Sequence, residues 1–345
     1  MPRKARIDAP GALQHIIIRG IEQKTIFRKD SDKKDFLDRL GKLLLDTQTA
    51  CYAWALMTNH VHLLLRSGTA PISSVMSRLL TGYAVSFNRR YHRYGHLFQN
   101  RYKSILCEDE PYLHQLVAYI HLNPYRAGMI ENLQALQTYP FSGHCALMGN
   151  TEVVWQDTDF VLAVFGKTAM SARKRYADYV SKCASAGRRS ELTGGGLIRS
   201  TGGWRAVKDA YRDGIRLTSD ERILGGSDFI RTTLSNADEE YDRRMRLQAL
   251  GIDLDAVLEA VCTHLSVDME EMASPSRKPM ICQARALAGY LAVRELRITG
   301  ATVARRLNVD RSSVSRSIGR VQEDPALKDI VKQVICSLFS EDLRH

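Results

Sequence analysis

The chain has 345 residues, of which 44% are hydrophobic and 25% charged, and its formal net charge is +11. This composition is ordinary for a globular protein, and the length allows two or three domains. The basic surplus favours a polyanionic partner, with nucleic acid first and an anionic membrane surface second. Seven scattered cysteines without a C-x-x-C pair argue against a disulfide framework or a zinc ribbon.

The same features bear on where the protein is found. Scattered cysteines fit a reducing cytosol. The start of the chain, MPRKARIDAPGALQH, contains no apolar core of a secretory signal. No apolar run approaches the roughly 18 residues that a membrane span needs. We therefore expect a soluble, cytoplasmic protein with no membrane partner.

Residues 1–145 alternate between strand and helix patterns. Strand patterns occupy 12–20, 51–58, 60–67 and 96–107. Helical spacing of apolar residues predicts helices at 31–47, 71–91 and 110–122. This β-α-β-β-α-β order predicts an α+β domain of the ferredoxin-like type, in which an antiparallel sheet carries helices on one face.

Residues 146–247 show weaker periodicity. A basic helix is expected at 167–182, and glycine clusters occur at 192–204 and 223–229. These clusters lack the spacing of a phosphate-binding loop, and no strand clearly precedes them. We interpret this part of the chain as a connecting or DNA-contacting segment.

Residues 248–345 are predicted to be helical, with an amphipathic helix at 283–296 and a helix-turn-helix at 299–321. Asn308 can adopt the left-handed conformation at the turn. The apolar residues expected to pack the two helices are Val303, Ala304, Leu307, Val309, Val314 and Ile318. The polar residues left facing outward are Arg311, Ser312, Ser313, Ser315, Arg316 and Arg320. Such a face suits the major groove of duplex DNA, although an ordinary helical hairpin with a solvated face is the alternative.

His60 and His62 lie one residue apart within an apolar strand. Strand residues at i and i+2 point to the same face, so the two imidazoles face the same way. A metal site is one explanation, and satisfied core histidines are the other.

Tyr119 and Asn123 lie four residues apart at the flank of the third helix, so their side chains are neighbours. Two imidazoles and one amide oxygen would give an N₂O metal site with open positions, suited to Mg²⁺ or Mn²⁺ held together with phosphate oxygens. Tyr119 beside that metal is a candidate nucleophile, with His121 or metal-bound water as its base. The alternative is a surface tyrosine on an amphipathic helix.

Cations and aromatic residues alternate in the segment 88–103. The cations are Arg89, Arg90, Arg93, Arg101 and Lys103, and the aromatic residues are Tyr91, Tyr94, Phe98 and Tyr102. Cations neutralise phosphates while aromatic rings stack on unpaired bases, so the segment favours nucleic-acid contact. A solvated basic loop over core aromatics is the alternative.

Three motifs resemble a known family. MTNHVHLLL, GHLFQNRYKS and YIHLNPYRAGMI are similar to motifs of the single-tyrosine HUH transposases, and among them of the REP-associated tyrosine transposases. The resemblance implies that His60 and His62 bind the metal, that Asn123 is the third ligand, and that Tyr119 is the nucleophile. It also implies cleavage of single-stranded DNA, often beside a hairpin, through a 5′-phosphotyrosine and a free 3′-OH, followed by strand transfer.

The C-terminal sequence resembles the DNA-binding domain of DnaA-type replication initiators. The similarity is carried by SRKPMICQARALAGYLAVREL and VDRSSVSR. It implies that Arg277 and Lys278 contact the DNA backbone and that Arg311, Ser312 and Ser313 face the groove. The initiators more often read His-Thr-Thr where this chain has Arg-Ser-Ser.

These observations predict three parts: an HUH transposase domain at 1–145, a connecting segment at 146–247 and a DnaA-like domain at 248–345. The expected function is a metal-dependent transposase that acts on single-stranded or hairpin DNA through its first domain and binds duplex DNA through its last, as a monomer or homodimer. Two alternatives remain. One is a catalytically silent DNA-binding regulator on the same fold, and the other is an RNA-binding protein that stacks bases without a metal.

Overall fold

A computed structural model describes residues 7, 11–99, 101–187, 192 and 220–340. The chain folds into two compact units. The first unit comprises Met1–Leu45, Thr49–Ser67 and Ile72–Leu234, and most of the second is Ser235–His345. In the described part of the chain, no helix is long and apolar enough to cross a membrane.

The first unit is built on a five-stranded sheet. Its strands are β1 (Leu13–Arg19), β2 (Ala50–Leu56), β3 (His60–Arg66), β4 (Lys103–Cys107) and β5 (Ile223–Leu224). They lie in the order β2-β3-β1-β4-β5, and all neighbours are antiparallel except β4 and β5. The first four strands have the ferredoxin-like order, which confirms the predicted α+β class. The parallel strand β5 was not predicted.

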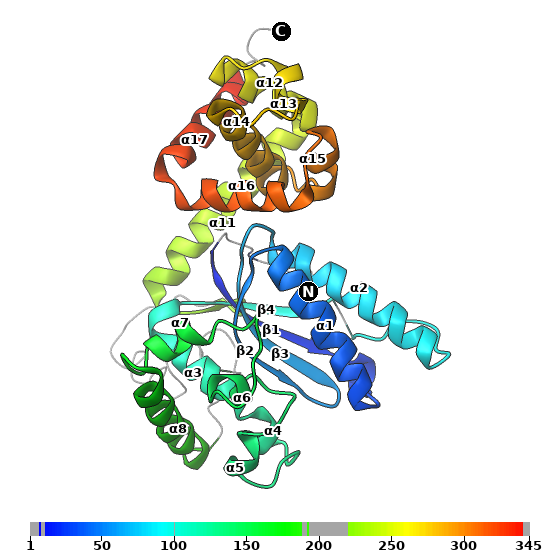
Figure 1. Cartoon of the computed structure of the whole chain (residues 1–345), viewed down its shortest axis with the longest axis vertical. Helices are drawn as coiled ribbons and strands as arrows, with labels where there is room; N and C mark the ends of the chain where they lie inside the picture. Colours follow the sequence, from blue (N-terminus) through cyan, green and yellow to red (C-terminus); the bar gives the residue numbers. More distant parts are fainter. Residues whose placement is uncertain (1–6, 8–10, 100, 188–191, 193–219, 341–345) are drawn as a thin grey trace. The chain divides into compact units, whose positions relative to one another are not determined.

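Two helices cover one face of this sheet, α1 (Asp30–Asp46) and α2 (Ile72–Arg90) (Figure 1). Phe36 of α1 and Tyr83 of α2 are fully buried, and their ring centroids lie 5.2 Å apart. Every second residue of β1, including Ile16 and Ile18, is buried toward this layer because strand side chains alternate between faces. The predicted arrangement of helices on one face therefore holds for α1 and α2.

A third helix, α3 (Asp109–His121), packs on the opposite face. Leu13 of β1 and Leu64 of β3 share a hydrophobic cluster with Leu116 and Val117 of α3. The sheet thus has helices on both faces rather than on one. The strand pattern could not reveal this, because α3 follows β4 after the β-α-β-β-α-β unit is complete. Alternation along β3 also places His60 and His62 on the α3 face, with Leu64.

Several short helices follow α3: α4 (Asn123–Arg126), α5 (Leu133–Leu136), α6 (His144–Leu147) and α7 (Thr158–Ala163). The longer α8 (Ala169–Ser185) confirms the predicted basic helix. Tyr176 of α8 is fully buried in the same cluster as α3. The described part of the expected connecting segment, up to Leu234, is therefore a component of the first unit.

Two other predictions for the connecting segment have different outcomes. The first glycine cluster, 192–204, lies outside the described residues apart from the buried Leu192. The second, 223–229, forms β5 and the start of α11 (Ser227–Ala249). The Gly226 backbone N–H donates to Glu108 Oε2 at 2.9 Å, which ties this turn to the end of β4.

One strand of the first unit is shorter than predicted. A strand was expected at 96–107, but β4 begins only at Lys103.

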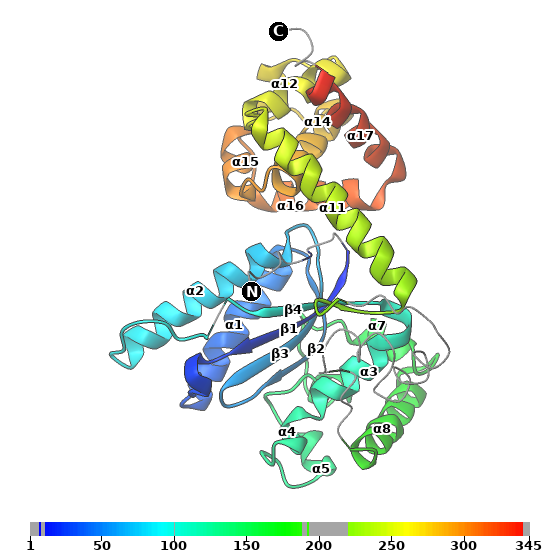
Figure 2. The ribbon, with the colours of Figure 1, turned by 180° about the vertical axis from the view of Figure 1, so that it is seen from behind.

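The second unit is helical, as predicted, and Figure 2 shows its helices from behind. They are α12 (Leu254–Leu265), α13 (Met269–Ala273), α14 (Pro279–Tyr290), α15 (Gly300–Arg306), α16 (Arg311–Glu323) and α17 (Pro325–Ser340). A π-helical turn, Leu291–Glu295, continues α14. Helices α15 and α16 form the predicted helix-turn-helix, and Asn308 adopts a φ of 51° at the turn. The apolar residues expected at its core are buried or packed against it: Val303, Ala304, Leu307, Val309, Val314 and Ile318.

Candidate functional site

A cavity of about 580 Å³ opens on the α3 face of the sheet. It is lined by all four residues that the sequence predicted to act together: His60, His62, Tyr119 and Asn123. Three cations also line it, namely Arg19, Lys103 and Arg126. None of the described residues that line it is Asp or Glu. A cavity with imidazole, phenol and amide groups and only positive formal charge suits a phosphodiester.

The two histidines project from β3 beside β1, where Arg19 pairs with His60 and Ile17 pairs with His62. Their ring centroids are 5.1 Å apart. Burial, assisted by the charge of Arg19, lowers the pKa of His60 to about 4. Burial, with smaller effects from neighbouring His15 and His60, holds the pKa of His62 well below its ordinary value. Both imidazoles are therefore neutral near pH 7, which is the form that binds metals.

Each of these imidazoles has one ring nitrogen engaged by the protein. The Nδ1 atom of His60 lies 2.7 Å from Asn59 Oδ1. The Nδ1 atom of His62 lies 2.9 Å from His15 Nε2, and both of these residues are buried. Sequence reasoning did not single out His15, because only the register of β1 against β3 shows that it lies beside His62 on the α3 face.

Tyr119 lies in the last turn of α3, and its ring meets the edge of the histidine cluster. Its centroid is 6.0 Å from that of His62 and 6.0 Å from that of His15, with steep interplanar angles. The guanidinium carbon of Arg126 lies 5.9 Å from the Tyr119 ring centroid. The placement follows from helix periodicity, because Leu116, Val117 and Ile120 are buried and leave Tyr119 at the flank.

Asn123 is the first residue of α4 and is separated from the end of α3 by one residue, Leu122. Its Nδ2 atom donates to the carbonyl oxygens of Tyr119, at 2.9 Å, and Ile120, at 3.3 Å. These bonds fix the amide, so its Oδ1 is the atom available to a ligand. Among the described residues, no group of three or more His, Cys, Asp or Glu side chains could hold a metal. The donor set that fits a divalent ion is therefore His60, His62 and the Asn123 amide oxygen, with the remaining positions open to phosphate or water.

The suggestion that His121 is the base for Tyr119 is not supported. His121 does not line the cavity and is fully buried. Its Nδ1 lies 2.7 Å from the hydroxyl oxygen of Tyr176 on α8, which in turn lies 3.3 Å from His144 Nδ1. Residues 119 and 121 are two apart on a helix, so their side chains leave it in well-separated directions.

The basic segment 88–103 divides into structural and exposed residues. Arg90, expected to contact DNA, instead forms ion pairs with Asp32 and Asp35 of α1. The Tyr91 hydroxyl donates to Asp32 at 2.7 Å. Burial raises the pKa of Asp32, but hydrogen bonds from Tyr91, two backbone N–H groups and Arg90 outweigh it and lower that pKa overall. Arg90 and Tyr91 therefore fasten α2 to α1.

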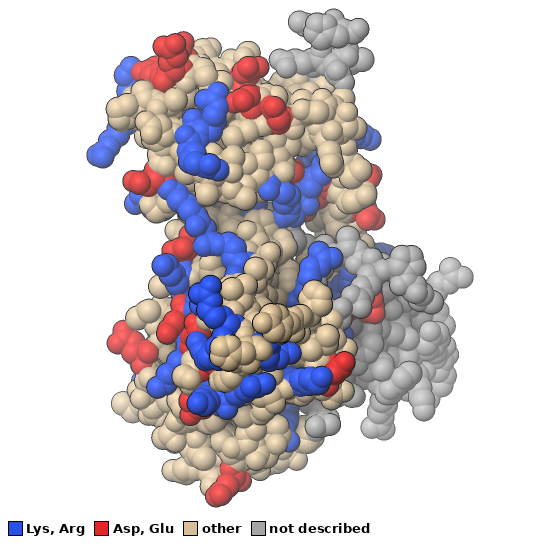
Figure 3. All heavy atoms as spheres, turned by 90° about the vertical axis from the view of Figure 1, so that its right-hand side faces the viewer, with Lys and Arg blue, Asp and Glu red and all other residues tan. Residues whose placement is uncertain are grey.

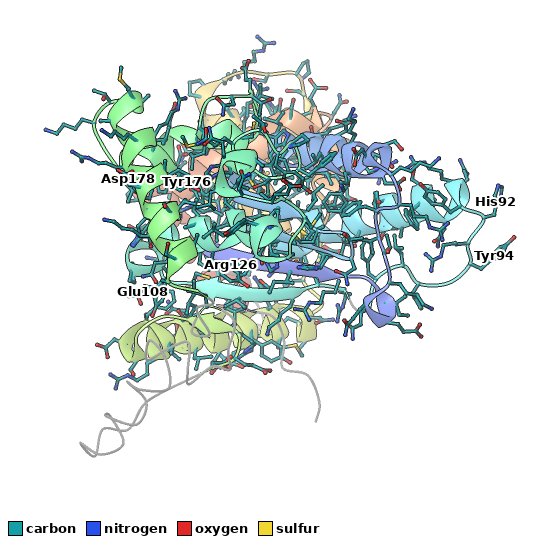
Figure 4. All side chains as sticks on the ribbon, turned by 90° about the horizontal axis from the view of Figure 1, so that it is seen from below. His92, Tyr94, Glu108, Arg126, Tyr176 and Asp178 are labelled. Atoms are coloured by element: carbon teal, nitrogen blue, oxygen red, sulfur yellow. The ribbon has the colours of Figure 1, made fainter. Side chains whose placement is uncertain are left out.

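The other cations of this segment are differently placed. Arg93 donates to Asn88 at 3.3 Å, whereas Arg89 and Arg101 are exposed and Lys103 lines the cavity. Tyr94 is 96% exposed, and Figure 4 shows it with His92 at the tip of the loop after α2. Figure 3 shows blue Lys and Arg side chains gathered in the middle of one face of the first unit.

The predicted duplex-binding residues lie on the second unit. Arg311, Ser312 and Arg316 are exposed on α16, and Ser313 is half-buried and accepts a hydrogen bond from Arg316 at 3.3 Å. Arg277 is exposed just before α14, and Lys278 forms an ion pair with Glu271.

Comparisons with known proteins agree with these two units. Residues 11–123 match the family described as "Transposase IS200 like". Residues 254–321 match the family described as "Bacterial dnaA protein helix-turn-helix". The first unit therefore contains a region similar to IS200-like transposases, which holds the first four strands and α3, and the second unit contains a region similar to the DnaA helix-turn-helix.

Among solved structures, the chain is similar to one described as "Structure of the REP associates tyrosine transposase bound to a REP hairpin". The TM-score is 0.36 at 15% sequence identity, and the match covers 46% of this chain and 98% of the other. No curated protein sequence matches the chain.

Proposed function

We propose that this protein is a metal-dependent endonuclease and strand transferase that acts on single-stranded DNA through a covalent 5′-phosphotyrosine at Tyr119. The observation that carries the proposal is the cavity itself. His60, His62, Tyr119 and Asn123 come from one strand and two helices, and they open onto one cavity with three cations. A structural role alone would not require these groups to share an opening.

A divalent ion, Mg²⁺ or Mn²⁺, would be held by His60, His62 and the amide oxygen of Asn123. When bound, it would act as a Lewis acid on the phosphoryl oxygens of the DNA and orient the scissile phosphate.

Covalent transfer divides the reaction into two balanced steps. In the first, the Tyr119 oxygen attacks phosphorus, an O–P bond forms, and the bond from phosphorus to the 3′ oxygen breaks. The phenol proton is lost, and the leaving oxygen takes up a proton to become a 3′-OH. In the second, a 3′-OH loses its proton and attacks phosphorus, a bond from phosphorus to this 3′ oxygen forms, and the bond from phosphorus to the Tyr119 oxygen breaks. The phenol oxygen takes up a proton, so strand joining needs no nucleotide cofactor.

The cations of the cavity provide electrostatic support for both steps. Arg19, Lys103 and Arg126 can offset the charge on the phosphoryl oxygens as the transition state forms. Arg126 is itself held by carbonyl oxygens at the end of α8, at 3.0 Å from Cys183 and 2.9 Å from Gly187. Its guanidinium carbon lies 5.9 Å from the centroid of the Tyr119 ring, so its charge is close to the proposed nucleophile.

The DNA substrate is proposed to be single-stranded, with a hairpin beside the cleavage site. The similar solved structure is of a REP-associated transposase bound to a REP hairpin, which is consistent with such a substrate. Exposed Arg89, Arg101 and Tyr94 are the surface contacts that remain once Arg90 and Tyr91 are assigned to the fold. The second unit would bind duplex DNA through Arg311, Ser312 and Arg316, with Arg277 and Lys278 on the backbone.

The test uses labelled single-stranded oligonucleotides that carry hairpins from DNA flanking the gene. The protein is incubated with Mn²⁺, with Mg²⁺ or with chelator, and a denaturing gel is scored for a protein–DNA adduct. We expect a metal-dependent adduct that is absent in Tyr119→Phe and present in Tyr112→Phe, a tyrosine of the same helix that does not line the cavity. Binding without any adduct would instead support a catalytically silent DNA-binding regulator.

A further inference from the structure

The hydrogen bonds behind His60 and His62 carry an inference beyond the ligand set. We infer that His15 is a positioning residue, which fixes the tautomer of His62 so that its Nε2 presents a lone pair to the cavity. The role of the presented nitrogen rests on the proposed function, but the tautomer itself does not.

His60 shows how such a bond determines a tautomer. The Nδ2 of Asn59 donates to the Gln23 carbonyl at 2.9 Å, so the Asn59 Oδ1 faces His60 Nδ1 at 2.7 Å. An amide oxygen can only accept a hydrogen bond. The hydrogen of neutral His60 is therefore on Nδ1, and Nε2 keeps its lone pair.

His62 has a partner that could act either way, because a neutral imidazole nitrogen is either donor or acceptor. If His15 Nε2 accepts, the hydrogen of His62 is on Nδ1 and its Nε2 can bind a metal. If His15 Nε2 donates, the hydrogen of neutral His62 moves to Nε2, and that atom can no longer ligate. The metal-binding competence of His62 therefore depends on the state of His15.

The surroundings allow His15 to determine this choice. His15 is 1% exposed and His62 is 3% exposed, so bulk water does not compete for their 2.9 Å bond. Their rings stack at 5.2 Å with an interplanar angle of 27°. Tyr119 meets both rings edge-on. His15 thus contacts a proposed ligand and the proposed nucleophile, although it does not itself line the cavity.

The arrangement places a hydrogen-bond partner behind each of the two histidines: the Asn59 amide oxygen, which can only accept, behind His60, and His15 Nε2, inferred to accept, behind His62. Partners of this kind orient a ligating imidazole and raise its basicity, and their loss typically lowers metal affinity by roughly 10- to 100-fold. The pairing of β1 with β3 brings His15 beside His62, whereas Asn59 lies in the hairpin turn directly before β3.

The first test measures the tautomer in metal-free protein labelled with ¹⁵N-histidine. Long-range ¹H–¹⁵N correlation spectra distinguish Nδ1–H from Nε2–H, and the His62 signals are assigned from a His62→Gln spectrum. We expect Nδ1–H at both His60 and His62. An Nε2–H tautomer at His62 would overturn the inference whether or not the protein binds metal or cleaves DNA.

The second test measures Mn²⁺ affinity by electron paramagnetic resonance in the full chain. His15→Gln keeps an acceptor and is expected to stay within about threefold of wild type, whereas His15→Phe removes it and should lose roughly 10- to 100-fold. His96→Phe, at an exposed histidine, is the matched control, and thermal melts check folding. Wild-type affinity in a folded His15→Phe would refute the role of His15. Absence of Mn²⁺ binding in the wild type would refute the proposed metal site and leave the tautomer result standing.

Discussion

Two histidine clusters lie on either side of α3, and they differ in one decisive respect. His15, His60 and His62 lie beside Tyr119, whereas His121 and His144 share the hydroxyl of Tyr176. In both clusters, burial lowers the histidine pKa, to about 4 for His60 and for His144. The first cluster opens into the cavity with cations, and neither His121 nor His144 lines that cavity. Perturbed pKa values alone therefore do not locate the site, since a buried structural cluster produces the same shifts.

The largest predicted difference between the clusters concerns the chemistry. His62→Ala should lower the rate of adduct formation by at least about 10³-fold, because it removes a metal ligand. His144→Phe should leave that rate within about threefold, because His144 is not at the cavity. The rates are measured at saturating Mn²⁺ on the same oligonucleotide. An equal loss of adduct-formation rate in both variants would contradict the assignment of the first cluster to the reaction and of the second to the fold.

Acid should destabilise the protein through histidines of both clusters. The pKa of His144 falls from about 6.5 when unfolded to about 4 when folded, so the unfolded chain binds the proton more readily. Its stabilising contribution is fully present above pH 6.5 and is lost as the pH falls toward 4. At 1.36 kcal/mol per pKa unit, that contribution is at most roughly 3 kcal/mol.

The measurement is the free energy of unfolding in urea between pH 7.5 and 4.5. His144→Phe should flatten the dependence, and His96→Phe, at an exposed histidine, should not. An unchanged slope in His144→Phe would show that this histidine is not held neutral by burial.

The cations of the cavity should have an intermediate effect. Arg126→Gln keeps much of the side-chain length but removes the charge, and we expect a 10- to 100-fold lower cleavage rate. Arg89→Gln changes an exposed cation outside the cavity and should weaken DNA binding without changing the rate at saturating DNA. The comparison of kcat with KM separates the two effects. A change in KM alone for Arg126→Gln would show that Arg126 contributes to DNA binding and does not stabilise the transition state.

The smallest predicted effect is structural. Tyr176→Phe removes the hydroxyl shared by His121 and His144, and it should lower the free energy of unfolding by about 1–3 kcal/mol because two buried imidazoles lose a partner. Adduct formation should persist at the wild-type rate below the melting temperature. Loss of adduct formation in a folded Tyr176→Phe variant would show that the cluster of His121, His144 and Tyr176 is needed for the cleavage reaction.

Much of the first cluster was predictable from local periodicity and motif resemblance. Alternation along a strand placed His60 and His62 on one face, and helical spacing placed Tyr119 near Asn123. His15 was not predicted, because it comes to lie beside His62 only through the pairing of β1 with β3, and these strands are far apart in sequence. Arg19 was missed for the same reason. Arg126 was missed although it is close to Asn123 in sequence, because the sequence pattern did not show that its side chain lines the cavity.

Other differences also come from long-range contacts. Arg90 matches the pattern of a basic DNA-binding segment, yet two carboxylates of α1 engage it. Strand β5 has only two residues, too few for a periodic signal, and its pairing with β4 joins distant parts of the chain. The helix-turn-helix was predicted more completely, because its core residues and its left-handed turn at Asn308 are local in sequence.

The most direct test of the central claim is the residue that carries the DNA in the covalent adduct. Trypsin should release residues 104–126 as one peptide, which contains Tyr112, Tyr119 and Tyr125. After nuclease digestion, tandem mass spectrometry locates the remaining 5′-phosphonucleotide within it. The account predicts this mass on Tyr119 only, and only after incubation with Mn²⁺ or Mg²⁺. A nucleotide on Tyr112 or Tyr125, or an adduct that forms equally in chelator, would contradict it.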